Sequence, residues 1–212
     1  MTFFRHVRLA AVIALNVASS GSLAQAVDQE LQQRMAKEKA DRRDCKIKIC
    51  DTARNKKADG DDIACKFVKT WTAVELKEKI LKGRFDWPFG NVQCTGDVKL
   101  ARKPLATVLA GGEVETKLEK HSVSCTLDQK DGKDKYSISF SIQPVVKFKD
   151  GKAIKASINW SDIQGSAVAK GALWSTATLD NYTGVLNGIA VESINDYFGP
   201  HCDEVKNDLG KK

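Results

Sequence analysis

Cysteines are the residues in this chain whose chemistry is most constrained by number and spacing. There are six, and an even set in an oxidising compartment forms disulfides. Zinc is the alternative, but its sites usually need close pairs of ligands, and only Cys45 and Cys50 form such a pair. The sequence therefore predicts disulfides among Cys45, Cys50, Cys65, Cys94, Cys125 and Cys202. Cys94 and Cys125 are the expected partners, since both lie on predicted strands that can be neighbours.

Residues for catalysis or cofactor binding do not form a known pattern. A serine or cysteine nucleophile needs a base, usually histidine, and after residue 26 the chain has only His121 and His201 and no Gly-x-Ser-x-Gly. The acidic run 59–62 lacks the ligand spacing of a calcium loop. Gly111-Gly112 lacks the further glycines and the lysine of a phosphate loop. The sequence indicates a non-enzymatic protein without a metal or cofactor.

The first 26 residues have the pattern of a cleaved signal peptide. Arg5 and Arg8 give a basic start, residues 9–18 are mostly apolar, and Ser22-Leu23-Ala24 offers a cleavage site. This run is too short to cross a bilayer, and no later stretch approaches the required length without charges. We therefore expect a periplasmic or secreted protein whose mature chain has no transmembrane segment.

The mature chain divides by composition into four parts. Residues 27–44 form a polar, charged arm, and residues 45–83 form a small helical lobe that contains three cysteines. A helix over 73–82 ends this lobe, because Thr72 and Glu75 match a capping box and Gly83 stops the helix. A sheet-plus-helix domain follows over 84–202, and residues 203–212 form a polar tail.

Two strands, 136–148 and 153–160, give the clearest pattern in the chain. They are joined around Asp150-Gly151, and a two-residue turn there would mix the apolar and polar faces. We predict a three-residue loop of Lys149, Asp150 and Gly151, since this register places the apolar side chains on one face. The expected pairs are Val146 with Ile154, Ile142 with Ile158, and Phe140 with Trp160.

Helical spacing of apolar residues predicts one long terminal helix from 161–164 to about Phe198, bent near 181–184. The expected fold is α+β, with an antiparallel sheet of four or five strands. The long C-terminal helix packs across one face of the sheet, and the disulfide-pinned helical lobe precedes it.

Four glycines in the predicted terminal helix lower its helix propensity. Close packing on the sheet is the ordinary reason for small residues, but they also suggest a cavity between helix and sheet. The first functional hypothesis is therefore an exported binding protein that holds an apolar or amphiphilic ligand there. The candidate wall residues are Val146, Ile154, Ile158, Trp160, Trp174 and Leu179.

A cell-envelope interaction module is the alternative. The arm would then tether the domain, while an aromatic cluster of Trp71, Phe85, Trp87 and Phe89, or a basic face, docks on a protein or an anionic polymer. The formal net charge is +7, of which the leader supplies two positive charges. The lysines mostly alternate with acidic residues, so no nucleic-acid partner is expected.

Overall fold

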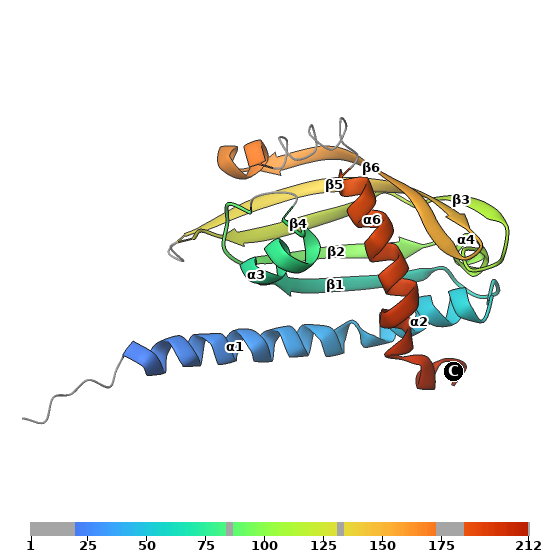
Figure 1. The fold of residues 1–212 in the computed structure, drawn as a ribbon, viewed down its shortest axis with the longest axis horizontal. Coiled ribbons are helices and arrows are strands. Elements are labelled where there is room, and N and C mark those ends of the chain that lie inside the picture. Colours follow the sequence, from blue (N-terminus) through green and yellow to red (C-terminus); the bar gives the residue numbers. More distant parts are fainter. Residues whose placement is uncertain (1–19, 84–86, 131–133, 173–184, 212) are drawn as a thin grey trace, which may run out of the picture. The chain divides into compact units, whose positions relative to one another are not determined.

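The computed structural model describes residues 20–83, 87–130, 134–172 and 185–211. The chain divides into two units, Met1–Ala36 and Lys37–Lys212. The first unit contains most of helix α1 (Ser20–Asp41), and the second contains the sheet and the other helices (Figure 1). The predicted leader lies largely outside the described residues.

A six-stranded antiparallel sheet forms the body of the second unit (Figure 1). Its strands are β1 (Ile63–Trp71), β2 (Val92–Leu100), β3 (Glu113–Lys117), β4 (His121–Asp128), β5 (Lys135–Lys149) and β6 (Lys152–Gly165). The order is β1-β2-β4-β5-β6, and β3 also pairs with β5. Because β4 pairs with residues 135–142 of β5 and β3 with residues 145–149, β3 and β4 follow each other along β5.

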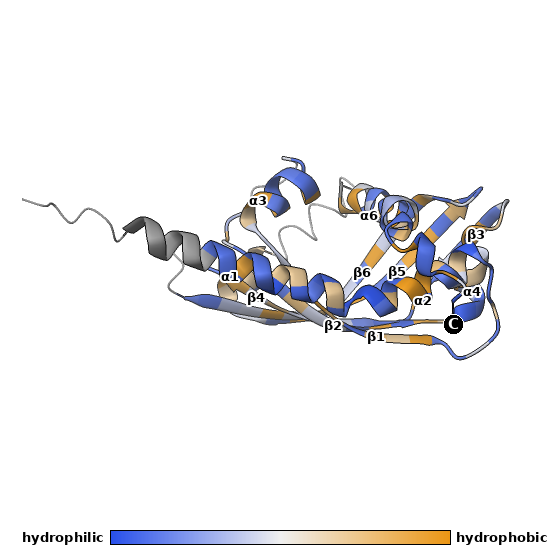
Figure 2. Ribbon diagram, turned by 90° about the horizontal axis from the view of Figure 1, so that it is seen from below, coloured by the Kyte–Doolittle hydropathy of each residue, from blue (hydrophilic) through white to orange (hydrophobic). Residues whose placement is uncertain are grey.

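Helices pack on one face of this sheet (Figure 2). Helix α3 (Ala73–Glu75) begins at the capping box of Thr72 and Glu75, as the sequence predicts, and continues into the π-helical turn η1 (Leu76–Ile80). The others are α2 (Arg43–Arg54), α4 (Arg102–Thr107), α6 (Val185–Asp196), the π-helical turn η2 (Tyr197–His201) and the short 3₁₀ helix η3 (Lys206–Asp208).

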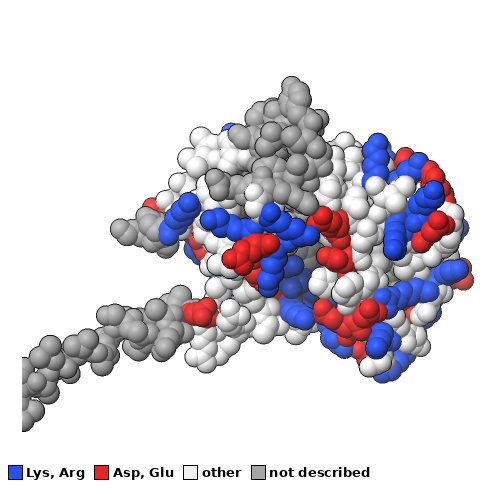
Figure 3. Space-filling model, in the orientation of Figure 1, with Lys and Arg blue, Asp and Glu red and all other residues white. Residues whose placement is uncertain are grey.

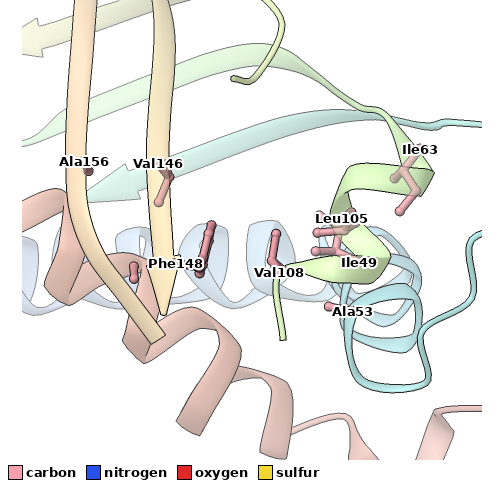
Figure 4. Packing of buried hydrophobic residues seen from close by; sticks show 9 residues of the cluster. Ile49, Ala53, Ile63, Leu105, Val108, Val146, Phe148 and Ala156 are labelled. Atoms are coloured by element: carbon pink, nitrogen blue, oxygen red, sulfur yellow. The ribbon is translucent and has the colours of Figure 1, made fainter. Parts of the chain in front are cut away.

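Two adjoining clusters of apolar side chains form the core. The first joins α2, α4, β1, β5 and β6 through Ile49, Ala53, Ile63, Leu105, Val108, Val146, Phe148, Ala153 and Ala156 (Figure 4). The second joins η1 to β2, β4 and β5 through Leu76, Phe89, Val92, Cys94, Val123, Cys125, Leu127, Ile138 and Ala169. Each cluster removes apolar surface from water, which is the main favourable contribution to folding.

Strand β1 gives the sheet one strand more than predicted. The sequence analysis assigned its residues to the helical lobe, yet Ile63, Cys65 and Phe67 alternate with Ala64 and Lys66 as strand residues do. The helical parts of the predicted lobe are α2, which the disulfides Cys45–Cys65 and Cys50–Cys202 fasten in place, and α3 with η1.

The hairpin between β5 and β6 differs from the predicted register. Lys149 pairs with Lys152, so the turn has two residues, Asp150 (φ 49°) and Gly151 (φ 78°), both with the positive φ of a type I′ turn. The predicted three-residue loop was wrong. A bulge at Ile154 then shifts the register, so that the apolar faces of the two strands still coincide.

This bulge changes the expected cross-strand pairs. Val146 lies opposite Ala156 and Ile142 lies opposite Trp160, in place of the predicted partners Ile154 and Ile158. Phe140 and Trp160 are not directly paired, although their rings still meet diagonally, with centroids 5.1 Å apart.

The terminal helix is shorter than predicted. Strand β6 continues to Gly165 through a second irregularity near Asp162, so residues 161–164 belong to the sheet. Residues 167–172 are helical, and the predicted bend at 181–184 lies outside the described residues. Helix α6 does pack on the sheet, where the Asn195 amide donates to Ala153 O (3.0 Å) and accepts from Ala153 N (2.8 Å).

The end of α1 is bound to the sheet rather than free. Glu38 is only 7% exposed, and its carboxylate accepts hydrogen bonds from Thr70 N (2.7 Å), Thr70 Oγ1 (2.8 Å) and Gln93 Nε2 (2.8 Å). Residues 37–41 of the predicted arm are therefore part of the folded unit.

Disulfides use all six cysteines. Cys94 is bonded to Cys125 directly across the ladder from β2 to β4, as predicted. Together with Cys45–Cys65 and Cys50–Cys202, this bond is compatible with an oxidising compartment.

In the part of the chain that the structure describes, no helix combines the length and the apolar character needed to cross a membrane.

Candidate functional site

A pocket opens where the sheet divides. Strand β2 pairs with β4 only over residues 92–96, while residues 97–100 of β2 pair only with β1. Strand β3 pairs only with β5. Within the described residues the second half of β2 thus has no ladder to β3, and the two strands border a cavity of about 370 Å³. This volume lies within the range of small-molecule sites, about 300–1,000 Å³.

The walls of this pocket are apolar. Helix α2 supplies Ile49, and α4 with its C-cap residue supplies Leu105 and Val108, across from Val146 and Phe148 of β5 (Figure 4). The C-terminal side is closed by Ile194, Tyr197 and Phe198. A ligand would therefore exchange water for aliphatic and aromatic surface over most of its length.

Covalent and polar contacts hold the walls in position. Cys45, which is bonded to Cys65, lines the pocket, and the Cys50–Cys202 disulfide packs against the lining residues Tyr197 and Phe198. The Arg54 guanidinium donates to Phe198 O (2.7 Å) and Gly199 O (3.0 Å) and pairs with Asp203 (2.8 Å). These bonds fasten η2 to α2, so the cavity does not depend on a flexible loop.

Phe67 lies at the edge of the pocket over a glycine. A Cβ on Gly96, its cross-strand neighbour, would lie 2.6 Å from Phe67 Cε1 and 2.9 Å from Ser122 O. Both distances are too short for carbon in contact with protein atoms, so only glycine lets the ring lie against the strand.

Cations predominate among the charged lining residues, with Arg42, Lys46, Lys66, Lys99 and Lys117 against Glu119. Basic and acidic side chains lie close together on the face shown in Figure 3. A lysine without an acidic partner therefore stands out as a candidate for ligand binding. Lys66, Lys99 and Lys117 are exposed, and none forms an ion pair within the described part of the chain. They give the pocket a positive rim.

The two other cations are already engaged. Arg42 donates to Val68 O and lies 3.9 Å from Glu38, and burial lowers its pKa without removing its charge at neutral pH. Lys46 bonds to Glu204 at 3.1 Å. Hydrogen bonds from His201 and Lys46 lower the pKa of Glu204 to about 2.

Two neutral hydroxyl groups interrupt the apolar lining. Thr116 is 6% exposed, and its Oγ1 is buried with no hydrogen-bond partner among the described residues. An unpaired buried hydroxyl costs about 1–3 kcal/mol. Tyr197 also lines the pocket, and burial raises its pKa to about 12, so its phenol is neutral at physiological pH.

Only part of the predicted ligand wall lies at this pocket. Val146 lines it, whereas Ile154 is 50% exposed on the bulge and Ile158 is not among the described lining residues. Trp160 borders a separate shallow hollow with Asp162 and Lys170. Trp174 and Leu179 lie outside the described residues.

The wall formed by α2 and α4 was not predicted from the sequence. Leu105 and Val108, three residues apart, lie on the same side of a short helix, and Ile49 with Ala53 has the same helical spacing. These patterns predict a buried face on each helix. They do not predict that the buried faces of α2 and α4 meet beside the place where β2 and β4 separate.

The aromatic cluster of the interaction-module hypothesis is largely packed. Phe89 is 6% exposed, and its ring meets Trp87 and Tyr136 at centroid distances of 5.3 and 5.7 Å. Trp87 Nε1 donates to Gly90 O, and Trp71 packs against the second core cluster. Phe85 lies outside the described residues. The described rings close one end of the core and do not form a projecting tip.

Neither histidine is among the described residues that line the pocket. His201 is exposed and lies 3.1 Å from Glu204. His121 starts β4, and burial lowers its pKa.

Comparison with known proteins gives no further guide. No family model matches the chain, and neither a curated protein nor a solved structure resembles it significantly.

Proposed function

We propose that this chain is an exported, non-enzymatic binding protein for a single-chain anionic amphiphile. The apolar chain of the ligand occupies the pocket between α2, α4, β5 and η2, and its acidic head lies at Lys66, Lys99 and Lys117. The observation that carries the proposal is an apolar cavity of about 370 Å³ whose lining includes exposed lysines that form no ion pair within the described residues. The predicted leader and the three disulfides support a periplasmic or secreted location.

Chain length is the first quantity to test. Each methylene group that enters an apolar site contributes about 0.8 kcal/mol, which is roughly fourfold in affinity. We expect the Kd of linear carboxylates from octanoate to hexadecanoate to fall by about this factor per carbon and then level off when the cavity is full. Calorimetry with each acid below its aggregation concentration measures the series.

A bulky residue in the pocket tests the location. Val98 lies on β2, lines the pocket and is half-buried, so Val98→Trp fills part of the cavity. Val68→Trp is the matched control, because Val68 is 38% exposed, lies on the neighbouring strand and is not among the described lining residues. Dodecanoate should bind the control and not Val98→Trp. Equal binding to both variants would place the ligand elsewhere.

Replacement of the three rim lysines tests the role of charge. Exposed ion pairs contribute about 0.2–1 kcal/mol each, so the Lys66→Gln/Lys99→Gln/Lys117→Gln variant should bind dodecanoate about tenfold more weakly. Binding of uncharged dodecanol should not change. A control variant with Lys48, Lys152 and Lys155 replaced by Gln loses the same charge at exposed sites outside the described lining. The same loss in both variants would mean that only net charge matters.

A further inference from the structure

Thr116 gives information about the ligand itself. It lies directly opposite Val146 in the ladder from β3 to β5, and both residues line the pocket. Its hydroxyl is buried with no hydrogen-bond partner among the described residues, although such groups in folded proteins are nearly always paired. Valine would fill the same volume without a polar atom, so packing does not account for threonine here.

The Thr116 hydroxyl can reach a ligand in the pocket by rotation of its side chain. Rotation about χ1 by about 120° can place Oγ1 where Cγ2 was, while Cγ2 takes the place of Hβ, and threonine commonly populates more than one χ1 state. A ligand oxygen beside Thr116 can therefore recruit the hydroxyl without moving the backbone of β3. Tyr197 supplies a second neutral hydroxyl group in the lining, whereas the lining lysines Lys66, Lys99 and Lys117 are exposed.

We infer that the ligand is an oxygenated chain, an acyl carboxylate with a hydroxyl substituent that hydrogen-bonds to Thr116. This inference rests on the proposed function and adds the class of amphiphile. A site whose buried polar group is satisfied only by the correct ligand discriminates against analogues that lack the partner group. One hydrogen bond of ordinary net strength corresponds to about five- to tenfold in affinity.

The probes are dodecanoate and its 2-, 3-, 6-, 9- and 12-hydroxy derivatives, with binding measured by calorimetry. With the wild-type protein, at least one hydroxy acid should bind about five- to tenfold more tightly than dodecanoate, and its position reports where along the chain Thr116 lies. Thr116→Val should remove this preference and leave dodecanoate binding unchanged or tighter. Thr116→Ser keeps the hydroxyl and should keep the preference.

Melting of the unliganded variants separates a ligand role from a structural one. Thr116→Val should melt at or above the wild-type temperature, because the unpaired hydroxyl is replaced by a methyl group of similar size. Thr95→Val, an exposed threonine on β2 that does not line the pocket, is the control for threonine loss.

The outcomes distinguish the two proposals. Failure of every probe to bind the wild-type protein overturns the proposed function. Binding of all probes with equal affinity, or a hydroxyl preference that survives in Thr116→Val, overturns this inference alone.

Discussion

Cys50 is bonded to Cys202, which lies 152 positions further along the chain, and neither side chain is exposed. The bond joins α2 to the segment that follows η2, and Val205, 1% exposed, packs beside it. Helix α2 lines the pocket through Ile49, and η2, which Cys202 directly follows, lines it through Tyr197 and Phe198. One covalent link thus fixes the distance between two sides of the proposed binding site.

Removal of this disulfide should destabilise the protein more than removal of Cys45–Cys65. Loop-closure entropy predicts about 5 kcal/mol for a loop of this length and about 3 kcal/mol for the loop of 20 residues between Cys45 and Cys65. Urea unfolding of Cys50→Ala/Cys202→Ala and Cys45→Ala/Cys65→Ala, without reductant, measures both free energies. The reverse order would mean that local packing, not the span of the loop, determines the loss.

The capping box and one disulfide were predicted correctly from the sequence. The capping box at Thr72 needs only residues three apart, and the pair Cys94–Cys125 follows from two strands that lie side by side. The hairpin register could not be obtained in this way. Its two-residue turn mixes the faces unless a bulge at Ile154 compensates, and alternation alone does not reveal a bulge.

The location of the pocket could not be predicted from residue patterns, for a different reason. Its walls come from α2, α4, β5 and η2, which meet because β2 leaves β4 after residue 96. That divergence is a tertiary property with no local signature. The sequence therefore suggested a cavity at the sheet and one of its wall residues, Val146, but not the helices opposite.

Glu38 should be required for stability despite its place in a charged helix. Glu38→Gln replaces one acceptor oxygen with an amide that cannot accept from Thr70 or Gln93, and hydrogen bonds to a charged group contribute about 1.5–3 kcal/mol each. We expect a loss of about 2–3 kcal/mol in unfolding free energy. Glu30→Gln, exposed on the same helix, should change it by less than about 0.5 kcal/mol. Similar small effects for both variants would contradict the buried position of Glu38.

Gly96→Ala should destabilise the sheet by about 1–3 kcal/mol, the usual cost of overpacking. The added methyl group meets both the Phe67 ring and the backbone oxygen of Ser122, so the ring cannot simply rotate away. Gly111→Ala is the control, because a Cβ there has no neighbour within 4 Å and the backbone needs no positive φ. Thermal or urea unfolding compares the two. A stable Gly96→Ala protein would show that the sheet can open at this position.

Tyr197 should make the protein lose stability in alkaline solution. Burial raises its pKa to about 12 in the folded state, while the unfolded chain loses the same proton near pH 10. Between these values the folded state binds more protons than the unfolded state, so the free energy of unfolding falls as pH rises. Two pKa units correspond to at most about 2–3 kcal/mol, fully present below pH 10 and lost by about pH 12.

Tyr197→Phe isolates this contribution, since it keeps the ring contacts with Phe198 and His201 and removes only the titrating group. Urea unfolding at pH 9 and pH 11.5 should give a smaller decrease for the variant than for the wild-type protein, with lysine titration common to both. If the two proteins lose equal stability, the phenol ionises without penalty. Its hydroxyl would then be in contact with water, and the pocket would be wetter beside η2 than its apolar lining implies.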